Sequence, residues 1–119
     1  MYIDDRTRIL HMRDSAREAR DFIKGRARED LEEDRLLVLA VVKALEVIGE
    51  AASKVSRNYR DEQPQIPWQS LIVIRNRLTH DYYDYDLDKV WTVALDELDP
   101  LLAQLDLLVQ TEQIDRPNE

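Results

Sequence analysis

The sequence has no cysteine and few helix breakers, with two glycines and four prolines among its 119 residues. Without cysteine the chain has no disulfide, no thiolate zinc site and no cysteine nucleophile, a pattern that suits a cytoplasmic protein. No apolar run approaches the roughly 20 residues that cross a bilayer, so we expect no membrane association. The first residues show no basic segment followed by an apolar one, and we expect no signal peptide.

The charge balance is strongly acidic. The chain has 25 Asp and Glu residues, 17 Lys and Arg residues and a formal net charge of −8. Such a charge repels nucleic acid at long range. The middle of the chain is locally basic, because residues 53–60 carry Lys54, Arg57 and Arg60 but no acid, and the only charges between Gln63 and His80 are two arginines. The acidic flanks either repel RNA or attract a basic protein partner, and the sequence leaves both open.

Apolar periodicity predicts an all-α helical bundle of four to five helices. The first helix covers residues 4–24, has one apolar stripe and stops at Gly25. The others cover residues 29–58, 67–79 and 87–98, with a fifth helix or a kink near Pro100 that continues to about residue 110. We expect one domain over residues 1–119, with a frayed tail over residues 114–119.

The second predicted helix is apolar on more than one face. Leu37, Val41 and Ile48 lie on one stripe, and Val38 and Leu45 widen it. Either the helix is wrapped entirely by its own chain or part of this surface meets a second copy. We favour the second interpretation, a homodimer.

The residues best suited to chemistry cluster in one segment, Arg75-Asn76-Arg77-Leu78-Thr79-His80-Asp81-Tyr82. Arginine binds phosphate through a rigid fork of donors, and histidine transfers protons near neutral pH. Five residues correspond to about 140° around a helix, so Arg75 and His80 do not share a face. Either the helix ends at Thr79 and His80 turns back, or two copies meet so that both residues of each line one cleft.

Each of these residues also has a plain structural interpretation. Arg75 could form a salt bridge, His80 could cap a helix C-terminus, and Arg77 is equally well a phosphate contact or a solvated charge. His11, on the first helix, is expected to be structural. The acidic spacing from residue 84 to 88 lacks the glycine and glutamate of a calcium loop, and we expect no metal site and no cofactor.

The segment carries the pattern R-x4-H-x-Y, which resembles the HepT branch of the HEPN superfamily. R-x4-H alone is a weak pattern. Further similarity follows in the order of that branch, over about residues 5–102, at Glu33-Asp34-Arg35, Ile48-Gly49-Glu50-Ala51, Ile66-Pro67-Trp68, Asp86-Leu87-Asp88 and Val90-Trp91. The sequence departs from the pattern at Asp81, an acid beside the site that could raise the pKa of His80 or repel substrate.

The resemblance implies a metal-independent ribonuclease that acts as a homodimer. In such an enzyme the RNA 2′-hydroxyl attacks the adjacent phosphate, so DNA is inert. By this resemblance the catalytic residues are Arg75, Asn76 and His80, where His80 transfers a proton and Arg75 stabilises charge on the phosphate. Arg77 and Tyr82 would contact the RNA.

The resemblance also implies a partner, an MNT-type nucleotidyltransferase antitoxin that attaches AMP to Tyr82. Tyr83 and Tyr85 are neighbours that could instead be packing residues or the modified ones. An added AMP would block RNA by bulk and by like-charge repulsion. The competing hypothesis is a non-catalytic helical subunit that binds substrate for, or regulates, a nucleotidyltransferase.

Overall fold

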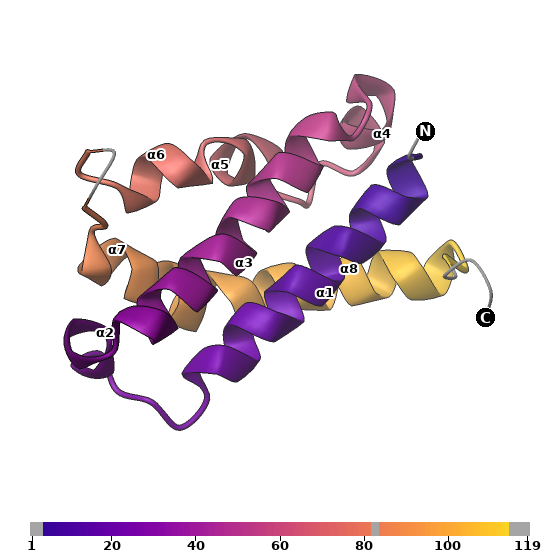
Figure 1. Ribbon diagram of the computed structural model, residues 1–119. Coiled ribbons are helices and arrows are strands. Elements are labelled where there is room, and N and C mark those ends of the chain that lie inside the picture. Colours follow the sequence, from indigo (N-terminus) through magenta and orange to yellow (C-terminus); the bar gives the residue numbers. More distant parts are fainter. Residues whose placement is uncertain (1–3, 82–83, 115–119) are drawn as a thin grey trace.

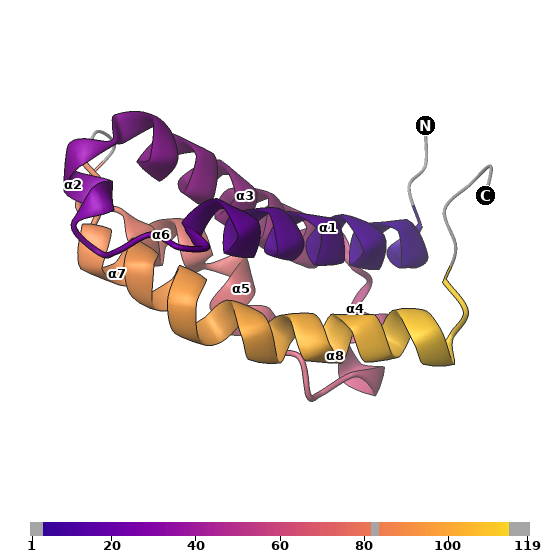
Figure 2. The ribbon, with the colours of Figure 1, turned by 90° about the horizontal axis from the view of Figure 1, so that it is seen from below.

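Helices α1 (Asp5–Ile23) and α3 (Arg35–Lys54) lie side by side, run in opposite directions and form one layer of the molecule (Figure 1). The computed structural model describes residues 4–81 and 84–114. Below this layer the chain forms one long rod from α7 (Leu87–Thr92) through η1 (Val93–Glu97) to α8 (Leu98–Thr111), as Figure 2 shows. The short helices are α2 (Asp30–Glu33), α4 (Arg57–Glu62), α5 (Trp68–Ile72) and α6 (Ile74–Leu78).

The described residues form no strand beyond an isolated bridge, so the predicted all-α bundle is confirmed. Helices α5 and α6 pack along α3 on the side away from α1 (Figure 1). No helix in the described part of the chain is long and apolar enough to cross a membrane.

Helix α1 matches its prediction closely. The Asp4 carboxylate accepts the Thr7 N–H at 2.9 Å and caps the start of the helix. Gly25 follows the end with a φ of 75°, which glycine adopts without steric cost. The predicted stripe is buried, at Ile9, Met12, Ala16, Ala19 and Ile23.

The predicted helix over residues 29–58 is instead divided into α2, α3 and the start of α4. Asp34 leaves helical geometry, with a φ of −125° and a ψ of 91°, and its carboxylate accepts the Leu37 N–H at 3.1 Å. Ser56 likewise caps α4 by accepting the Tyr59 N–H at 3.3 Å. Short polar side chains at these positions offer the backbone an alternative to a continuous helix.

The third and fourth predicted helices also differ in detail. A turn at Val73 separates α5 from α6, within three consecutive β-branched residues that favour helix weakly. The predicted fifth helix near Pro100 corresponds to α8, which begins at Leu98 and continues from η1 without an intervening loop. Pro100 has no N–H and its ring crowds the carbonyl four residues earlier, and the chain accommodates this through the π-helical turn η1 just before it.

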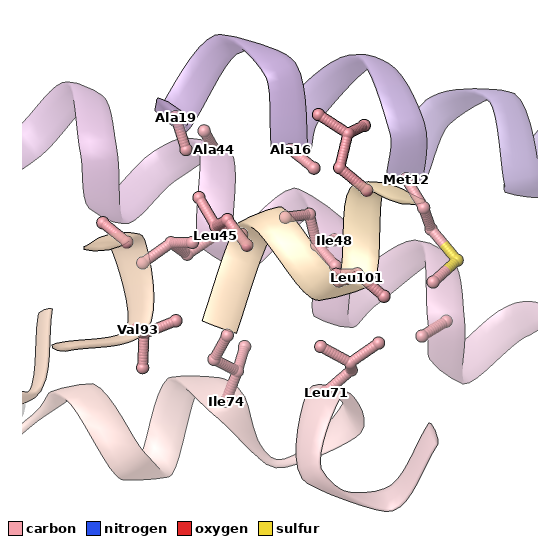
Figure 3. Close-up of a cluster of buried hydrophobic side chains, with 14 of the residues drawn as sticks. Met12, Ala16, Ala19, Ala44, Leu45, Ile48, Leu71, Ile74, Val93 and Leu101 are labelled. Carbon is pink, nitrogen blue, oxygen red and sulfur yellow. The ribbon is translucent and has the colours of Figure 1, made fainter. Parts of the chain in front are cut away.

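The core lies between the two layers. Side chains from α1, α3, α5, α6, η1 and α8 meet there, as Figure 3 shows for Met12, Ala16, Leu45, Ile48, Leu71, Ile74, Val93 and Leu101. Ile114 also packs into this core, with 3% of its surface exposed. The predicted fraying therefore does not apply to Ile114, and residues 115–119 lie outside the described residues.

Candidate functional site

The end of α6 carries most of the predicted site. Ile74 and Leu78 face the core, whereas Arg75 and Asn76 are exposed to solvent. Within the described residues the side chains of Arg75 and Asn76 take part in no hydrogen bond or ion pair. Arg75 therefore does not form the salt bridge of its structural interpretation, and its five guanidinium donors remain available to a ligand.

His80 lies at the base of a loop that joins α6 to α7. Thr79 and Tyr85 form an antiparallel bridge, and the His80 N–H donates to the Asp84 carbonyl at 2.9 Å. The Asp86 N–H donates to the Leu78 carbonyl at 2.7 Å and closes the loop from the other side. The backbone of His80 is thus held in place while its side chain is exposed.

Asp81, the residue that departs from the family pattern, is part of this loop. Its carboxylate accepts the Asp84 N–H at 3.0 Å. That bond uses one lone pair of the carboxylate to shape the turn, so the acid has a structural role beside the site.

Arg77 is held within the protein. Its guanidinium forms a bidentate pair with Glu97, at 3.1 and 2.7 Å, and donates to Ser70 Oγ at 2.9 Å. Neither sequence interpretation anticipated this pairing. To reach an RNA phosphate, Arg77 would have to leave Glu97.

Arg75 opens onto a groove of about 470 Å³ that crosses the outer face of α3. We call it the Arg75 groove. It is lined from α1 by Arg8 and His11, from α3 by residues between Lys43 and Ser53, and from α5 and α6 by Ile72, Ile74 and Arg75. The groove thus joins three segments that are far apart in the sequence.

The Arg75 groove contains charges of both signs, with more cations than carboxylates. Its cations Arg8, Lys43 and Arg75 form no ion pair within the described residues. Of its two carboxylates, Glu50 is bound to Lys54 at 3.1 Å. In a chain with a net charge of −8, three unpaired cations around one groove make a local site for an anion such as phosphate.

The structure does not bring all predicted residues together in one chain. His80 is not among the residues that line the Arg75 groove. The helix does end at Leu78, one residue before the predicted end, but the following segment leads into the loop and not into the groove. Of these two residues, only Arg75 lines the groove of a single chain.

Tyr82, the predicted RNA contact and AMP acceptor, lies outside the described residues, as does Tyr83. Tyr85 is half-buried and packs on the core, and the Arg35 guanidinium lies 5.5 Å from the centre of its ring. This cation–π contact and the core packing hold the ring of Tyr85 against the protein.

The position of His11 differs from the one that the sequence predicts. This residue was expected to be structural, yet it is exposed and lines the groove that Arg75 lines. Its position one residue from the buried Met12 gave no sign of this, because only the packing of α1 on α3 places it there. The described residues hold no group of three or more His, Asp or Glu side chains placed to bind a metal ion.

Comparison with known proteins gives consistent matches over most of the chain. Residues 12–108 match the family described as "Ribonuclease HepT-like". A "Putative RNase" of Caldanaerobacter subterraneus subsp. tengcongensis is 31% identical over 76% of this chain and 81% of its own length. Another "Putative RNase", from Methanocaldococcus jannaschii, is 31% identical over 76% of this chain and 74% of its own length. A "Probable ribonuclease HepT" of Thermococcus cleftensis is 30% identical over 67% of this chain and 73% of its own length. No solved structure matches the chain.

Proposed function

We propose that this chain, which belongs to the HepT-like ribonuclease family, is an RNA-cleaving toxin that works as a homodimer and without a metal ion. The observation that carries the proposal is the state of Arg75, Asn76 and His80. All three are exposed, and none has its side chain bound within the described residues. A family motif whose polar groups are left free of structural partners is suited to binding a ligand.

The proposed reaction is attack by a 2′-hydroxyl on the neighbouring phosphorus. His80 takes the proton from the hydroxyl, the 2′-oxygen bonds to phosphorus as the P–O5′ bond breaks, and the 5′-oxygen takes up a proton, which leaves a 2′,3′-cyclic phosphate and a 5′-hydroxyl. Arg75 binds the phosphate oxygens and stabilises the charge that develops on them, and Asn76 orients the phosphate. DNA lacks the nucleophile, so only RNA is a substrate.

The geometry supports a shared site. Arg75 borders the Arg75 groove, whereas His80 stands outside it. A second copy laid across α3 would bring the His80 of one chain to the Arg75 of the other. The first turns of α3 keep an apolar surface for such a contact, since Leu36 is 77% and Leu39 43% exposed. We favour this arrangement over the fully self-wrapped helix.

Regulation would come from a nucleotidyltransferase partner. In this proposal the Tyr82 phenol attacks the α-phosphate of ATP, pyrophosphate leaves and AMP stays on the tyrosine oxygen. Tyr82 follows His80 by two residues in the sequence, so AMP on Tyr82 adds a negative phosphate to the segment that contains the catalytic histidine, where it would repel the RNA backbone. The packing of Tyr85 against Arg35 favours Tyr82 over it as the acceptor.

The first test is RNA cleavage by the purified chain in EDTA. We expect cleavage by the parent, a loss of about 10²–10⁴-fold for His80→Ala and of about 10²–10³-fold for Arg75→Ala. Mixing the two inactive variants, with exchange of subunits, should restore part of the activity, because one shared site of the mixed dimer is intact. The matched control is Arg57→Ala, which removes an exposed cation outside the groove.

Three results would go against the proposal. Cleavage that continues unchanged in both variants would remove Arg75 and His80 from the mechanism. A mixture as inactive as its components would place the site within one chain. If expression of the parent alone does not slow growth and the purified parent cuts no RNA, the non-catalytic subunit becomes the better hypothesis. Modification is tested separately, by the intact mass of the chain after co-expression with a nucleotidyltransferase, which would show the added AMP.

A further inference from the structure

The α1 side of the Arg75 groove contains a second histidine. His11 is exposed at the groove and its side chain is bound to no described residue. A histidine that is neither packed nor hydrogen-bonded is free to contact a ligand in the groove. It is also the one histidine that shares a groove with Arg75 within a single chain.

The neighbours of His11 are suited to an anion. Arg8 lies one turn earlier on α1, also lines the groove and forms no ion pair within the described residues, so its guanidinium can bind an anion there. Lys43 lines the groove from α3, and Glu46 is its one carboxylate without an ion pair there.

The proposed reaction leaves one proton unassigned. Cleavage needs a base for the 2′-hydroxyl and an acid for the departing 5′-oxygen, and a single imidazole placed beside the nucleophile does not reach both at once. His80 fills the first role in the proposed function.

We propose that His11 is the general acid of RNA cleavage, and this inference rests on the proposed ribonuclease function. His11 in its protonated form donates a proton to O5′ as the P–O5′ bond breaks. The 2′-oxygen has by then lost its proton to His80 and bonded to phosphorus. One proton enters His80 and one leaves His11, so the products are a 2′,3′-cyclic phosphate and a free 5′-hydroxyl. Arg75 and Arg8 hold the phosphate between them.

The test compares two substrates with one changed atom. The first is a short oligonucleotide with a single ribonucleotide at a site that the parent cuts, and the second has sulfur in place of the bridging 5′-oxygen. A thiolate leaves without a proton because thiols are far stronger acids than alcohols. We expect His11→Ala to lose about 10²–10⁴-fold in kcat on the oxygen substrate and to match the parent on the sulfur substrate.

Two controls separate chemistry from folding. Arg20→Ala removes an exposed cation from α1 outside the groove and should cleave both substrates as the parent does. Thermal unfolding and solution mass of His11→Ala should equal those of the parent, because the side chain is exposed.

The inference and the function on which it rests can fail separately. If the parent cuts RNA and His11→Ala is as fast, the inference is wrong and the proposed function stands. If His11→Ala is slow on both substrates alike, His11 does not act as the acid. A loss of activity that follows a change in solution mass would make it an interface residue instead. If the parent cuts no RNA, both proposals fall together.

Discussion

Two arginines on α6, two positions apart, have different surroundings. Arg75 is exposed and has no partner in the described part of the chain, whereas Arg77 is tied to Glu97 and Ser70. The Arg77 side chain is 29% exposed and that of Glu97 41%, so the pair is only partly shielded from solvent. Its two hydrogen bonds still connect α6 to η1. We therefore expect Arg77 to have a positioning role, whereas Arg75 would bind the phosphate in the proposed mechanism.

A double-mutant cycle on Arg77→Gln and Glu97→Gln tests this assignment. Urea unfolding should give a coupling free energy of about 1 kcal/mol, near the upper end for exposed pairs because two hydrogen bonds are involved. Arg75→Gln is the matched control on the same helix and should change stability by less than about 0.5 kcal/mol. If Arg77 contacted RNA directly, Arg77→Gln would weaken RNA binding much more than Glu97→Gln does. That result would contradict a purely positioning role.

At the level of elements, Gly49 determines how closely α3 and the site-bearing helices approach. A Cβ atom at this position would lie 2.6 Å from the Leu71 carbonyl oxygen and 2.8 Å from Ile74 Cγ2. Such distances are far shorter than van der Waals contact, and the nearer atom belongs to the backbone. The missing side chain of Gly49 thus allows α5 and α6 to lie against α3 and places Arg75 over its groove.

Gly49→Ala should therefore destabilise the protein although alanine favours helix. The gain in helix propensity is about 1 kcal/mol, and overpacking against a backbone carbonyl costs about 1–3 kcal/mol, so we expect a net loss of up to about 2 kcal/mol in urea unfolding. RNA cleavage should fall as well, because α6 moves. Lys54→Ala, at an exposed position of α3 outside the groove, is the control and should change stability by no more than about 0.5 kcal/mol. A more stable Gly49→Ala variant would show that α5 and α6 shift without cost.

The same elements show what the sequence could and could not predict. The stripe of α1 and its glycine stop follow from periodicity and local backbone preference, and both are confirmed. The breaks at Asp34 and Ser56 depend on side chains that compete locally with the helix, a weaker signal than the apolar run between them. The motif at Arg75 is readable because its spacing is local. The groove is not, because His11 reaches it only through the contact of α1 with α3.

For the whole molecule, Glu112 connects parts of the chain that are far apart in sequence. Its carboxylate accepts the Tyr59 hydroxyl at 2.9 Å and the Gln63 side-chain amide at 3.3 Å, and its backbone carbonyl accepts from Arg6 at 3.2 Å. The end of α8 is thereby joined to α4 and to the first turn of α1. This junction lies at the end of the bundle where the chain both begins and finishes (Figure 2), so the substitution of Tyr59 tests global stability without touching the Arg75 groove.

Burial, and then the hydrogen bond and charge of Glu112, raise the pKa of Tyr59 well above its usual value. A pKa that is higher in the folded than in the unfolded state stabilises the protein fully below the unfolded value, about 10 for tyrosine, and less as the pH rises towards the folded value. Tyr59→Phe should thus lower the free energy of unfolding by about 1–2 kcal/mol at pH 7, and the difference from the parent should shrink above about pH 10. Urea unfolding at pH 7, 9 and 10.5 measures it, with Tyr85→Phe as the control because its hydroxyl has no hydrogen bond to the described residues. A loss that stays constant across this range would mean that folding does not raise the pKa of Tyr59.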